Sequence, residues 1–517
     1  MSKPSLIFFI ILSFCLAFLT QFLFLTDVPG LHFDEAWQGV FAWRISSENQ
    51  FWPIAAMNSY TSPVLHYLLA VVFKIFSPTI FTMRSFLGFL NLTTALLLST
   101  FLGSLQKDKK TSFLAVGSFL LFWALLPISV FNHRFYVEVT VFHGLCLSLF
   151  LWGLRLLKIS KKKSHILILS SVLLGTYSHI LFITVPFAAL LFAALENPNV
   201  LDRSLRKSVS VLFFLLSPLA LRMGLGLGRA LPIVLFCLLV LAGIFFILSA
   251  YNDKFLKKIL KFTIKQKAKI YTTLIVLTFP FLILFFSLFW NGSWPYAQAT
   301  GHLLWYWVPV NLTLLGLSYF FCRESLFSKA FLISFAFTSA LILKPTSRYY
   351  TIPLTLLLLG FAQTFASLKL SKLKRASFIL IFAIWNTYLF WGAYIIPFQH
   401  FGAFNREFGF KFFHDSSRDF RPYQKAFLWA VKNNCQSTLY WVEDDRFLYP
   451  LRFLNLTAPP PKKGSHCKWD KNNLFFSHIP EYYPGMKVNK NTKPPFENVK
   501  FLAHSIEWGD LAFWVRK

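Results

Sequence analysis

Two adjacent carboxylates stand near the N-terminus, in the segment LHFDEAWQG that begins at Leu31. Asp34 and Glu35 follow an apolar stretch, from about Ser5 to Leu25, that is long enough to cross a membrane. Ionisable groups beside a membrane are costly to desolvate and usually mark function. A carboxylate in a partly dry cleft can act as a general base on a hydroxyl or an amine. The alternative interpretation is a solvated loop at the membrane interface.

A second polar segment, FNHRFYVEV, begins at Phe131 and separates two later apolar stretches. It contains His133, Arg134 and Glu138. On a helix, Arg134 and Glu138 would share a face because they are four residues apart, so one interpretation is a simple ion pair. The functional alternative is a second acidic residue that faces the first across a cavity, with Arg134 near a phosphate group.

Two further segments carry polar side chains between apolar stretches. The segment GTYSHI places Tyr177 and His179 at a turn between two short apolar stretches. For His179, a hydrogen-bonded interfacial histidine is the alternative to a functional one. The segment KPTSRYYTIP contains Lys344, Arg348 and Tyr349 just before another apolar stretch.

The composition indicates what surrounds these segments. Of the 517 residues, 56% are hydrophobic, which is more apolar surface than a soluble core of this length can bury. Apolar stretches of spanning length recur from about residue 5 to about residue 396. We therefore expect an all-α polytopic membrane protein with about 13 transmembrane helices in residues 1–396. A small α/β extracytoplasmic domain is expected in residues 397–517, where polar sequence contains aromatic strand patterns.

The formal charge of +30 reflects membrane orientation rather than nucleic-acid binding, because the basic residues cluster in short loops between apolar stretches. The segment from Pro63 to Phe76 is apolar but short. If it crossed the membrane, the first two basic runs, which begin at Lys107 and Lys158, would lie outside. We expect it to lie in the outer interface instead. The four polar segments and the C-terminus then face outward, which predicts a bacterial inner-membrane protein with its site in the periplasm. The basic runs begin at Lys107, Lys158, Asp202, Lys254 and Lys369.

This topology places Lys344 and Arg348 outside, against the usual charge preference. A lipid-linked phosphate at the membrane surface would explain them, and snorkelling toward lipid headgroups is the alternative. Cys435 and Cys467 fall in the polar C-terminal region, where an extracytoplasmic location would allow a disulfide.

In this order, the four segments resemble the GT-C glycosyltransferases, specifically the superfamily of dolichyl-phosphate-mannose protein mannosyltransferases and lipid A aminoarabinose transferases. TSPVLHYLLAVVFKIF from Thr61 and MRSFLGFLN from Met83 also match. The ordered set carries the resemblance over nearly the whole membrane part. It implies a GT-C type membrane glycosyltransferase that moves a sugar from a polyprenyl-phosphate donor to an extracytoplasmic lipid, glycan or protein acceptor, by an inverting displacement.

The resemblance also implies residue roles. Asp34 would be the catalytic base, while Glu35 and Glu138 would orient substrates or support that base. Lys344, Arg348 and Arg134 would hold the donor phosphate. The substrate-binding residues would be His133, Arg134, Tyr177, His179, Lys344, Arg348 and Tyr349. We expect no obligatory cofactor or metal, because the sequence lacks the His and Cys spacing of a zinc site, although related enzymes vary in their use of a divalent metal.

Two other functions would use similar features. A transporter or flippase for a lipid-linked sugar would have many spans and outer basic residues, but the sequence shows none of the related halves common in transporters. A polysaccharide polymerase or ligase with a lipid-linked oligosaccharide donor would depend on outer arginine and histidine residues without needing Asp34.

Overall fold

The structure is a computed structural model, and it describes the larger part of the chain. The described residues are 3–23, 25–26, 31, 33–48, 63–126, 134, 138–157, 159–227, 230–277, 318–341, 347–368, 371–390, 431–432, 439–441, 453–454, 456, 474–478, 499–504 and 511–516.

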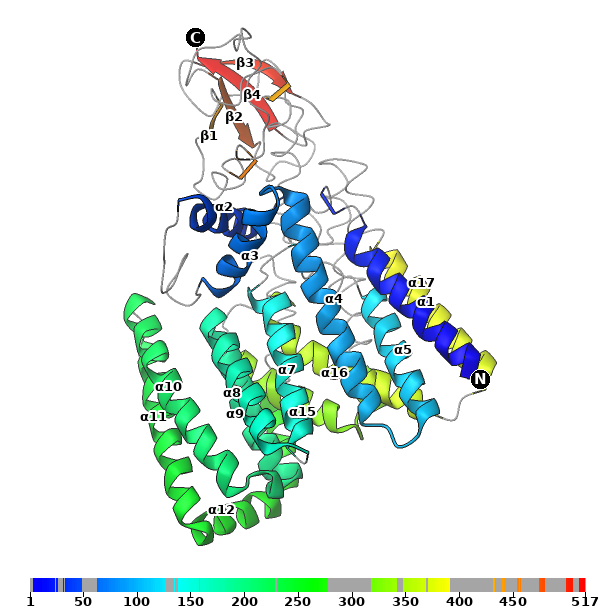
Figure 1. Cartoon of the computed structure of the whole chain (residues 1–517), viewed down its shortest axis with the longest axis vertical. Coiled ribbons are helices and arrows are strands. Elements are labelled where there is room, and N and C mark those ends of the chain that lie inside the picture. Colours follow the sequence, from blue (N-terminus) through cyan, green and yellow to red (C-terminus); the bar gives the residue numbers. More distant parts are fainter. Residues whose placement is uncertain are drawn as a thin grey trace.

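Helices dominate the described residues up to 390 (Figure 1). Short π- or 3₁₀-helical turns, labelled η, interrupt the α-helices. In chain order the elements are α1 (Lys3–Phe22), α2 (Phe33–Ser47), α3 (Val64–Ile75), α4 (Ile80–Ser104), α5 (Lys109–Leu125), η2 (Glu138–Phe142), α7 (His143–Leu156), α8 (Lys161–Ser178), η3 (Ile180–Ile183), α9 (Thr184–Glu196), η4 (Pro198–Val200), α10 (Arg203–Leu227), α11 (Ala230–Tyr251), α12 (Asp253–Lys265), α15 (Leu326–Leu341), η5 (Ser347–Tyr350), α16 (Thr351–Ser367) and α17 (Lys372–Phe390).

Five described helical segments are long and apolar enough to cross a membrane: Lys3–Phe22, Ile80–Ser104, Val139–Leu156, Arg203–Leu221 and Ile233–Tyr251. Shorter apolar helices accompany them, α15 and α16 among them. Because these helices recur along the chain, the protein is a helical membrane protein. The count of about thirteen spans stays a prediction, since parts of the spans expected at about residues 270–290, 302–321 and 376–396 lie outside the described residues.

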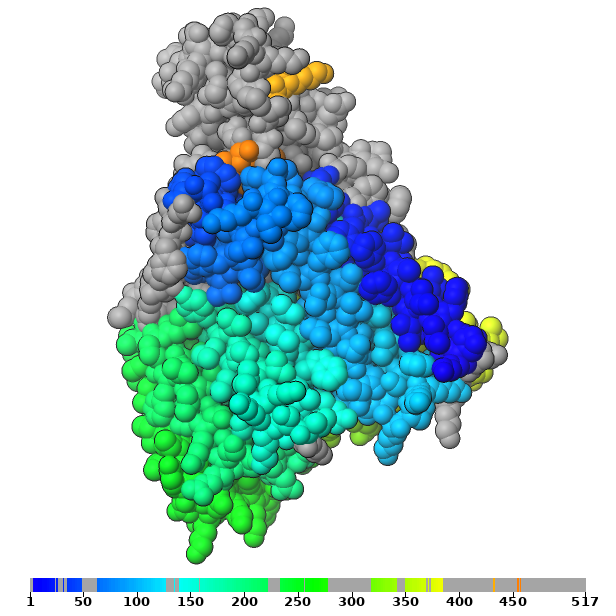
Figure 2. All heavy atoms as spheres, viewed as in Figure 1, coloured from blue at the N-terminus to red at the C-terminus, as the bar shows by residue number. Residues whose placement is uncertain are grey.

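The hairpin of α10 and α11 shows how these helices meet lipid. Small residues such as serine and glycine allow the two helices to approach closely. As a result, the Ser210 hydroxyl of α10 donates a hydrogen bond to the carbonyl of Gly243 in α11, at 2.7 Å. Large apolar side chains cover the outer surface of the hairpin, which projects from the bundle in green in Figure 2. Those that are more than half exposed are Val211, Leu215, Val234, Leu238, Leu241 and Leu248.

The bundle has two distinct ends (Figure 1). At one end, α2 and α3 lie beneath the C-terminal sheet, and the N-terminus of α4 begins beside them. At the other end lie the N-terminus of α1, the turn between α4 and α5, and the basic helix α12. Since the basic sequence gathers at the second end, the arrangement agrees with the charge pattern of the sequence.

Aromatic packing holds the centre of the bundle together. Phe122 of α5 contacts Phe361 and Phe365 of α16 and Phe382 of α17, with ring centroids 5.1, 5.3 and 4.8 Å away. The Trp152 indole N–H of α7 donates to the carbonyl of Leu97 in α4, at 2.9 Å. The Trp152 side chain is half-buried, and this bond fixes α7 against α4.

The C-terminal part contains a four-stranded sheet in the order β1-β2-β4-β3. The strands are β1 (Leu439–Trp441), β2 (Leu474–His478), β3 (Val499–His504) and β4 (Leu511–Arg516). β1 and β2 are parallel and the other neighbours are antiparallel, with a bulge between Phe501 and Ala503 of β3. That this region forms a separate α/β domain stays a prediction, because most of residues 397–517 lies outside the described residues.

Phe453 joins the C-terminal part to the membrane part. Its side chain is fully buried and lies 6.3 Å, between ring centroids, from Phe73 of α3. It also packs on Gly39 of α2, where an added Cβ would come within 2.3 Å of the Phe453 ring. Figure 2 shows the orange atoms of Phe453, Leu454 and Leu456 against the blue atoms of α2 and α3. The C-terminal region is thus seated on α2 and α3 through an aromatic side chain that only a glycine can accommodate.

Candidate functional site

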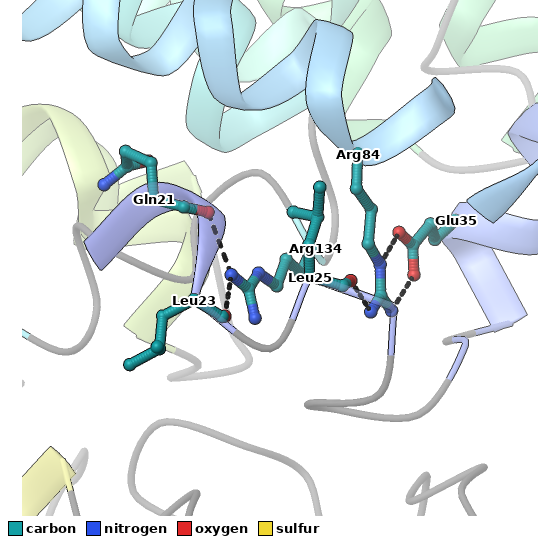
Figure 3. A network of polar contacts seen from close by, with 6 residues as sticks. All are labelled: Gln21, Leu23, Leu25, Glu35, Arg84 and Arg134. Atoms are coloured by element: carbon teal, nitrogen blue, oxygen red, sulfur yellow. Dashed lines mark hydrogen bonds and ion pairs between the residues drawn. The ribbon is translucent and has the colours of Figure 1, made fainter. Parts of the chain in front are cut away.

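The segment with the two adjacent carboxylates is helical rather than a loop, because Asp34 and Glu35 lie in the first turn of α2. The Glu35 side chain is fully buried and accepts two hydrogen bonds from Arg84 of α4, Nε to Oε1 at 2.6 Å and Nη2 to Oε2 at 2.8 Å (Figure 3). Arg84 is also fully buried, and its Nη1 donates to the carbonyl of Leu25 at 2.8 Å. The interpretation as a solvated loop is therefore wrong for Glu35.

The energetics of this pair indicate how firmly it holds α2. Removing one partner of a buried ion pair costs about 3–5 kcal/mol, because the other charge is left without compensation. The bidentate geometry also fixes the direction of both side chains. The Glu35–Arg84 pair therefore holds the N-terminus of α2 against α4.

Arg134 holds the chain that leads from α1 to α2. Its Nη2 donates to the carbonyls of Gln21, at 2.9 Å, and Leu23, at 2.7 Å, and its side chain is fully buried (Figure 3). The Gln21 side chain in turn accepts from the amide of Asn91 in α4, at 2.7 Å. Arg84 and Arg134 thus bind neighbouring carbonyls in the last turn of α1 and just after it, although the two arginines are 50 residues apart in sequence. A contact between Arg134 and a phosphate stays a prediction.

Asp34 lies one residue before Glu35, in the first turn of α2. Its side chain is outside the described residues. The N-terminus of a helix favours a negative charge, since the first backbone N–H groups point toward it. Because Glu35 is anchored to Arg84, the backbone of Asp34 is held at a defined place at this end of the bundle.

A second group of polar residues lies at the turn between α8 and α9. His179 is buried, its Nδ1 accepts from the backbone N–H of Leu181 at 3.2 Å, and its ring lies 6.2 Å from that of Tyr349. His143 of α7 lies 5.9 Å from His179, between ring centroids, and its Nε2 faces the carbonyl of Gly175 at 3.2 Å. The structure thus brings together two predicted residues, His179 and Tyr349, and adds His143.

Glu138 begins η2, a π-helical turn that leads directly into α7. Such turns are frequent at functional sites, because they displace side chains from the regular helical register. η2 packs against α4 and against η5, the turn that carries Arg348 and Tyr349. The backbones of Glu138 and Arg348 therefore belong to neighbouring turns, while their side chains are outside the described residues.

The remaining predicted residues divide into two groups. Tyr177 is half-buried in the last turn of α8, two residues from His179. His133, Lys344, Cys435 and Cys467 lie outside the described residues, so their predicted roles and the predicted disulfide stay predictions.

The expectation that no metal is obligatory, and the alternative that a divalent metal is used, both stay predictions. Within the part of the chain that the structure describes, no group of three or more His, Cys, Asp or Glu side chains could hold a metal ion. That part excludes the side chains of Asp34 and Glu138, which are the acidic residues most relevant to the question.

Sequence reasoning missed Arg84 and His143 as site residues. For Arg84 a signal was present, because an arginine inside an apolar helix, here near the N-terminus of α4, requires a buried partner. His143 is five residues after Glu138, close enough for a shared site. Neither partner could be identified from the sequence, since Glu35 and Gly175 approach only through tertiary packing.

Comparison with known proteins adds no relative: no family model, no curated protein and no solved structure matches this chain.

Proposed function

We propose that the protein is a membrane glycosyltransferase of GT-C type, which transfers a sugar from a polyprenyl-phosphate donor to an acceptor outside the cytoplasm. The observation that carries the proposal is the buried Glu35–Arg84 pair, which holds a second carboxylate, Asp34, in the first turn of a helix at one end of the bundle. Such a buried ion pair is hard to explain by stability alone, because apolar residues of similar volume often serve as well.

In the proposed reaction, Asp34 accepts the proton of an acceptor hydroxyl or amine. The acceptor oxygen or nitrogen then attacks the anomeric carbon from the side opposite the phosphate, and the bond between that carbon and the phosphate oxygen breaks. The phosphate leaves with the polyprenyl chain, and the configuration at the anomeric carbon inverts. Lys344 and Arg348 stabilise the charge of the leaving phosphate.

The contacts of Arg134 and Glu35 support a positioning role for both. Arg134 holds the carbonyls of Gln21 and Leu23, and Glu35 holds Arg84, so both act on Asp34 through the chain around it. His179 and Tyr349 lie on the same side of the bundle as η2 and η5, where Glu138 and Arg348 would meet the donor. No cofactor is part of this proposal.

The decisive experiment compares wild type, Asp34→Asn and Glu48→Gln in proteoliposomes with a panel of purified polyprenyl-phosphate sugars. Glu48 is exposed just beyond the end of α2 and serves as the matched carboxylate control. Loss of a general base lowers a rate by about 10²–10⁴-fold, so Asp34→Asn is expected to fall by that factor while Glu48→Gln keeps the wild-type rate. Transfer at the wild-type rate by Asp34→Asn would show that the base assignment is wrong.

The rival functions give different results in the same vesicles. A flippase would move the labelled lipid across the bilayer without changing it. A polymerase or ligase would use lipid-linked oligosaccharides and would tolerate Asp34→Asn.

The proposed periplasmic orientation has its own test. Single cysteines beside Lys344 and Arg348 should react with an impermeant reagent in intact spheroplasts. Labelling only after permeabilisation would place this end of the bundle in the cytoplasm.

A further inference from the structure

Two uncharged polar side chains are buried on α2 and α3, two helices that pack against each other. Gln38 of α2 is 2% exposed and His66 of α3 is 1% exposed. Within the described part of the chain, neither the amide of Gln38 nor either ring nitrogen of His66 has a hydrogen-bond partner. Together they leave four buried donor or acceptor atoms without a partner on these two helices.

Aromatic rings surround His66 on the α2 side. Its ring lies edge-on to Trp37 and to Phe41, with centroids 5.0 and 5.3 Å away. Trp37 and Phe41 stack on each other at 5.1 Å. His66 is therefore packed against aromatic rings, and these ring contacts give neither of its nitrogens a hydrogen bond.

This arrangement is energetically unfavourable unless something else satisfies it. Leaving a buried polar group without a partner costs about 1–3 kcal/mol, and native proteins retain few such groups. A leucine and a phenylalanine would fill the same volumes without that cost. Retaining glutamine and histidine here is therefore best explained by a polar ligand that supplies the missing partners.

Gln38 and the ring pair lie on the same face of α2 as Asp34. Successive helical positions turn by about 100°, so positions 34, 37, 38 and 41 fall within an arc of about 100°. Gln38 is four residues from Asp34, which corresponds to about 6 Å along the helix axis. Glu35 and Gly39 fall on the adjoining side, where the contacts with Arg84 and Phe453 lie.

We propose that Gln38 and His66, flanked by Trp37 and Phe41, form a subsite that binds the sugar ring of the donor lipid one helical turn from Asp34. This inference rests on the proposed function. The subsite binds the hydroxyl groups of the sugar through the amide and the imidazole, and the sugar's apolar C–H surface meets the aromatic rings.

The chemistry of the four side chains favours a neutral sugar over an anion or a metal ion. Among side chains, the strongest phosphate ligands are the cationic donors arginine and lysine, and this group contains neither. Gln38 supplies both donors and an acceptor, which matches hydroxyl groups that also donate and accept. Burial lowers the pKa of His66 to about 3, so its ring is neutral at physiological pH and likewise donates from one nitrogen and accepts at the other.

The test measures binding separately from transfer. Radiolabelled polyprenyl-phosphate mannose, polyprenyl-phosphate glucose and bare polyprenyl phosphate are titrated against the detergent-solubilised full chain and against Gln38→Met and His66→Phe. Each variant keeps the approximate volume of the side chain and removes its hydrogen-bonding atoms. We expect each variant to bind the preferred sugar lipid about 10-fold more weakly, the effect of one or two lost hydrogen bonds, and to bind bare polyprenyl phosphate like wild type.

Matched controls are Gln106→Met and His165→Phe, which make the same chemical changes on half-buried residues near the basic end of the bundle. Both should bind every probe like wild type. Thermal unfolding of all four variants separates a folding defect from a binding defect. Gln38→Met and His66→Phe should melt no lower than wild type, since they remove unsatisfied polar atoms.

Three results would overturn the subsite. Unchanged binding of sugar lipids by both variants would show that the polar pair does not contact the sugar. Equal weakening for bare polyprenyl phosphate would assign the pair to the lipid or phosphate instead. A melting point well below that of wild type in both variants would show that their polar atoms stabilise the fold. If wild type binds no sugar lipid more tightly than bare polyprenyl phosphate, the proposed function itself fails.

Discussion

Removing Arg84 should both destabilise the protein and stop transfer, and these two effects can be separated. In Arg84→Met, the carboxylate of Glu35 stays fully buried but loses both of its hydrogen bonds from Arg84. The carbonyl of Leu25 loses its donor as well. The N-terminal turn of α2 is then no longer tied to α4.

The expected loss of stability follows from the geometry. With charge centres about 4 Å apart and an effective dielectric constant of about 20, the attraction is about 4 kcal/mol. Measured losses for removing one partner of a buried pair are about 3–5 kcal/mol. We therefore expect Arg84→Met to lower the free energy of unfolding by about 4 kcal/mol. Arg84→Lys should lose less, because it keeps the charge but cannot form both hydrogen bonds.

The double variant Glu35→Leu with Arg84→Met separates stability from function. Replacing both charges by apolar side chains of similar volume is often neutral or stabilising, so the double variant should regain most of the stability lost in the single one. It should still transfer sugar at least about 10²-fold more slowly, because Asp34 has lost its anchor. Unfolding is followed in detergent, and transfer is measured in proteoliposomes.

Two outcomes would refute this reasoning. If Arg84→Met unfolds within about 1 kcal/mol of wild type, the pair does not have the strength expected of a buried ion pair. If the double variant is stable and transfers at the wild-type rate, the pair does not position Asp34.

Three further predictions concern neighbouring contacts. Gly39→Ala should destabilise the contact between α2 and the C-terminal part, because its Cβ would lie 2.3 Å from the ring of Phe453. Adding Phe453→Ala should relieve part of this loss. Limited proteolysis of the C-terminal part measures both effects. Arg134→Met should lower kcat without raising KM for the donor, since its described hydrogen bonds run to backbone carbonyls, whereas a phosphate contact would raise KM. Stability should fall as pH drops from about 6.5 toward 3, by at most about 1.4 kcal/mol per pH unit from His66, because burial lowers its pKa to about 3 and the unfolded chain binds the proton first. Unfolding of His66→Phe across this pH range should lack that contribution.

The helices were predictable where apolar length alone defines them. The sequence predicts apolar spans at about residues 5–25, 82–105 and 231–251. α1, α4 and α11 begin and end within a few residues of these bounds, because few other structures satisfy the backbone of such apolar segments in lipid. The short helix α3 was also expected, and His179 does mark the turn between α8 and α9. The helical state of α2 was missed because its pattern is too polar and too aromatic to read as a span or as a clear amphipathic helix.

The candidate site was less predictable because it depends on contacts between distant segments. The sequence pointed to Asp34 and Glu35 but could not identify Arg84 as the partner of Glu35, since 49 residues separate them. The pairing of Arg134 with Glu138 stays a prediction, because the Glu138 side chain is outside the described residues, and nothing in the sequence indicated that Arg134 also donates to carbonyls more than 100 residues earlier. Hydrophobic periodicity specifies which residues are buried, but it does not specify which polar groups meet inside.

The length of α3 determines whether the predicted residues share one face of the membrane. Its 12 residues extend about 18 Å, well short of the roughly 30 Å of a hydrocarbon core. α2 and the N-terminus of α4 lie at the same end of the bundle as α3, so the chain returns to α4 without crossing (Figure 1). Asp34 and Glu35 in the first turn of α2 therefore belong to the end where α4 begins and where α5 ends before Arg134. Which side of the membrane this end faces is predicted by the charge rule alone. That Asp34, Glu35 and Arg84 lie at one end of the bundle follows instead from the positions of α2, α3 and the N-terminus of α4.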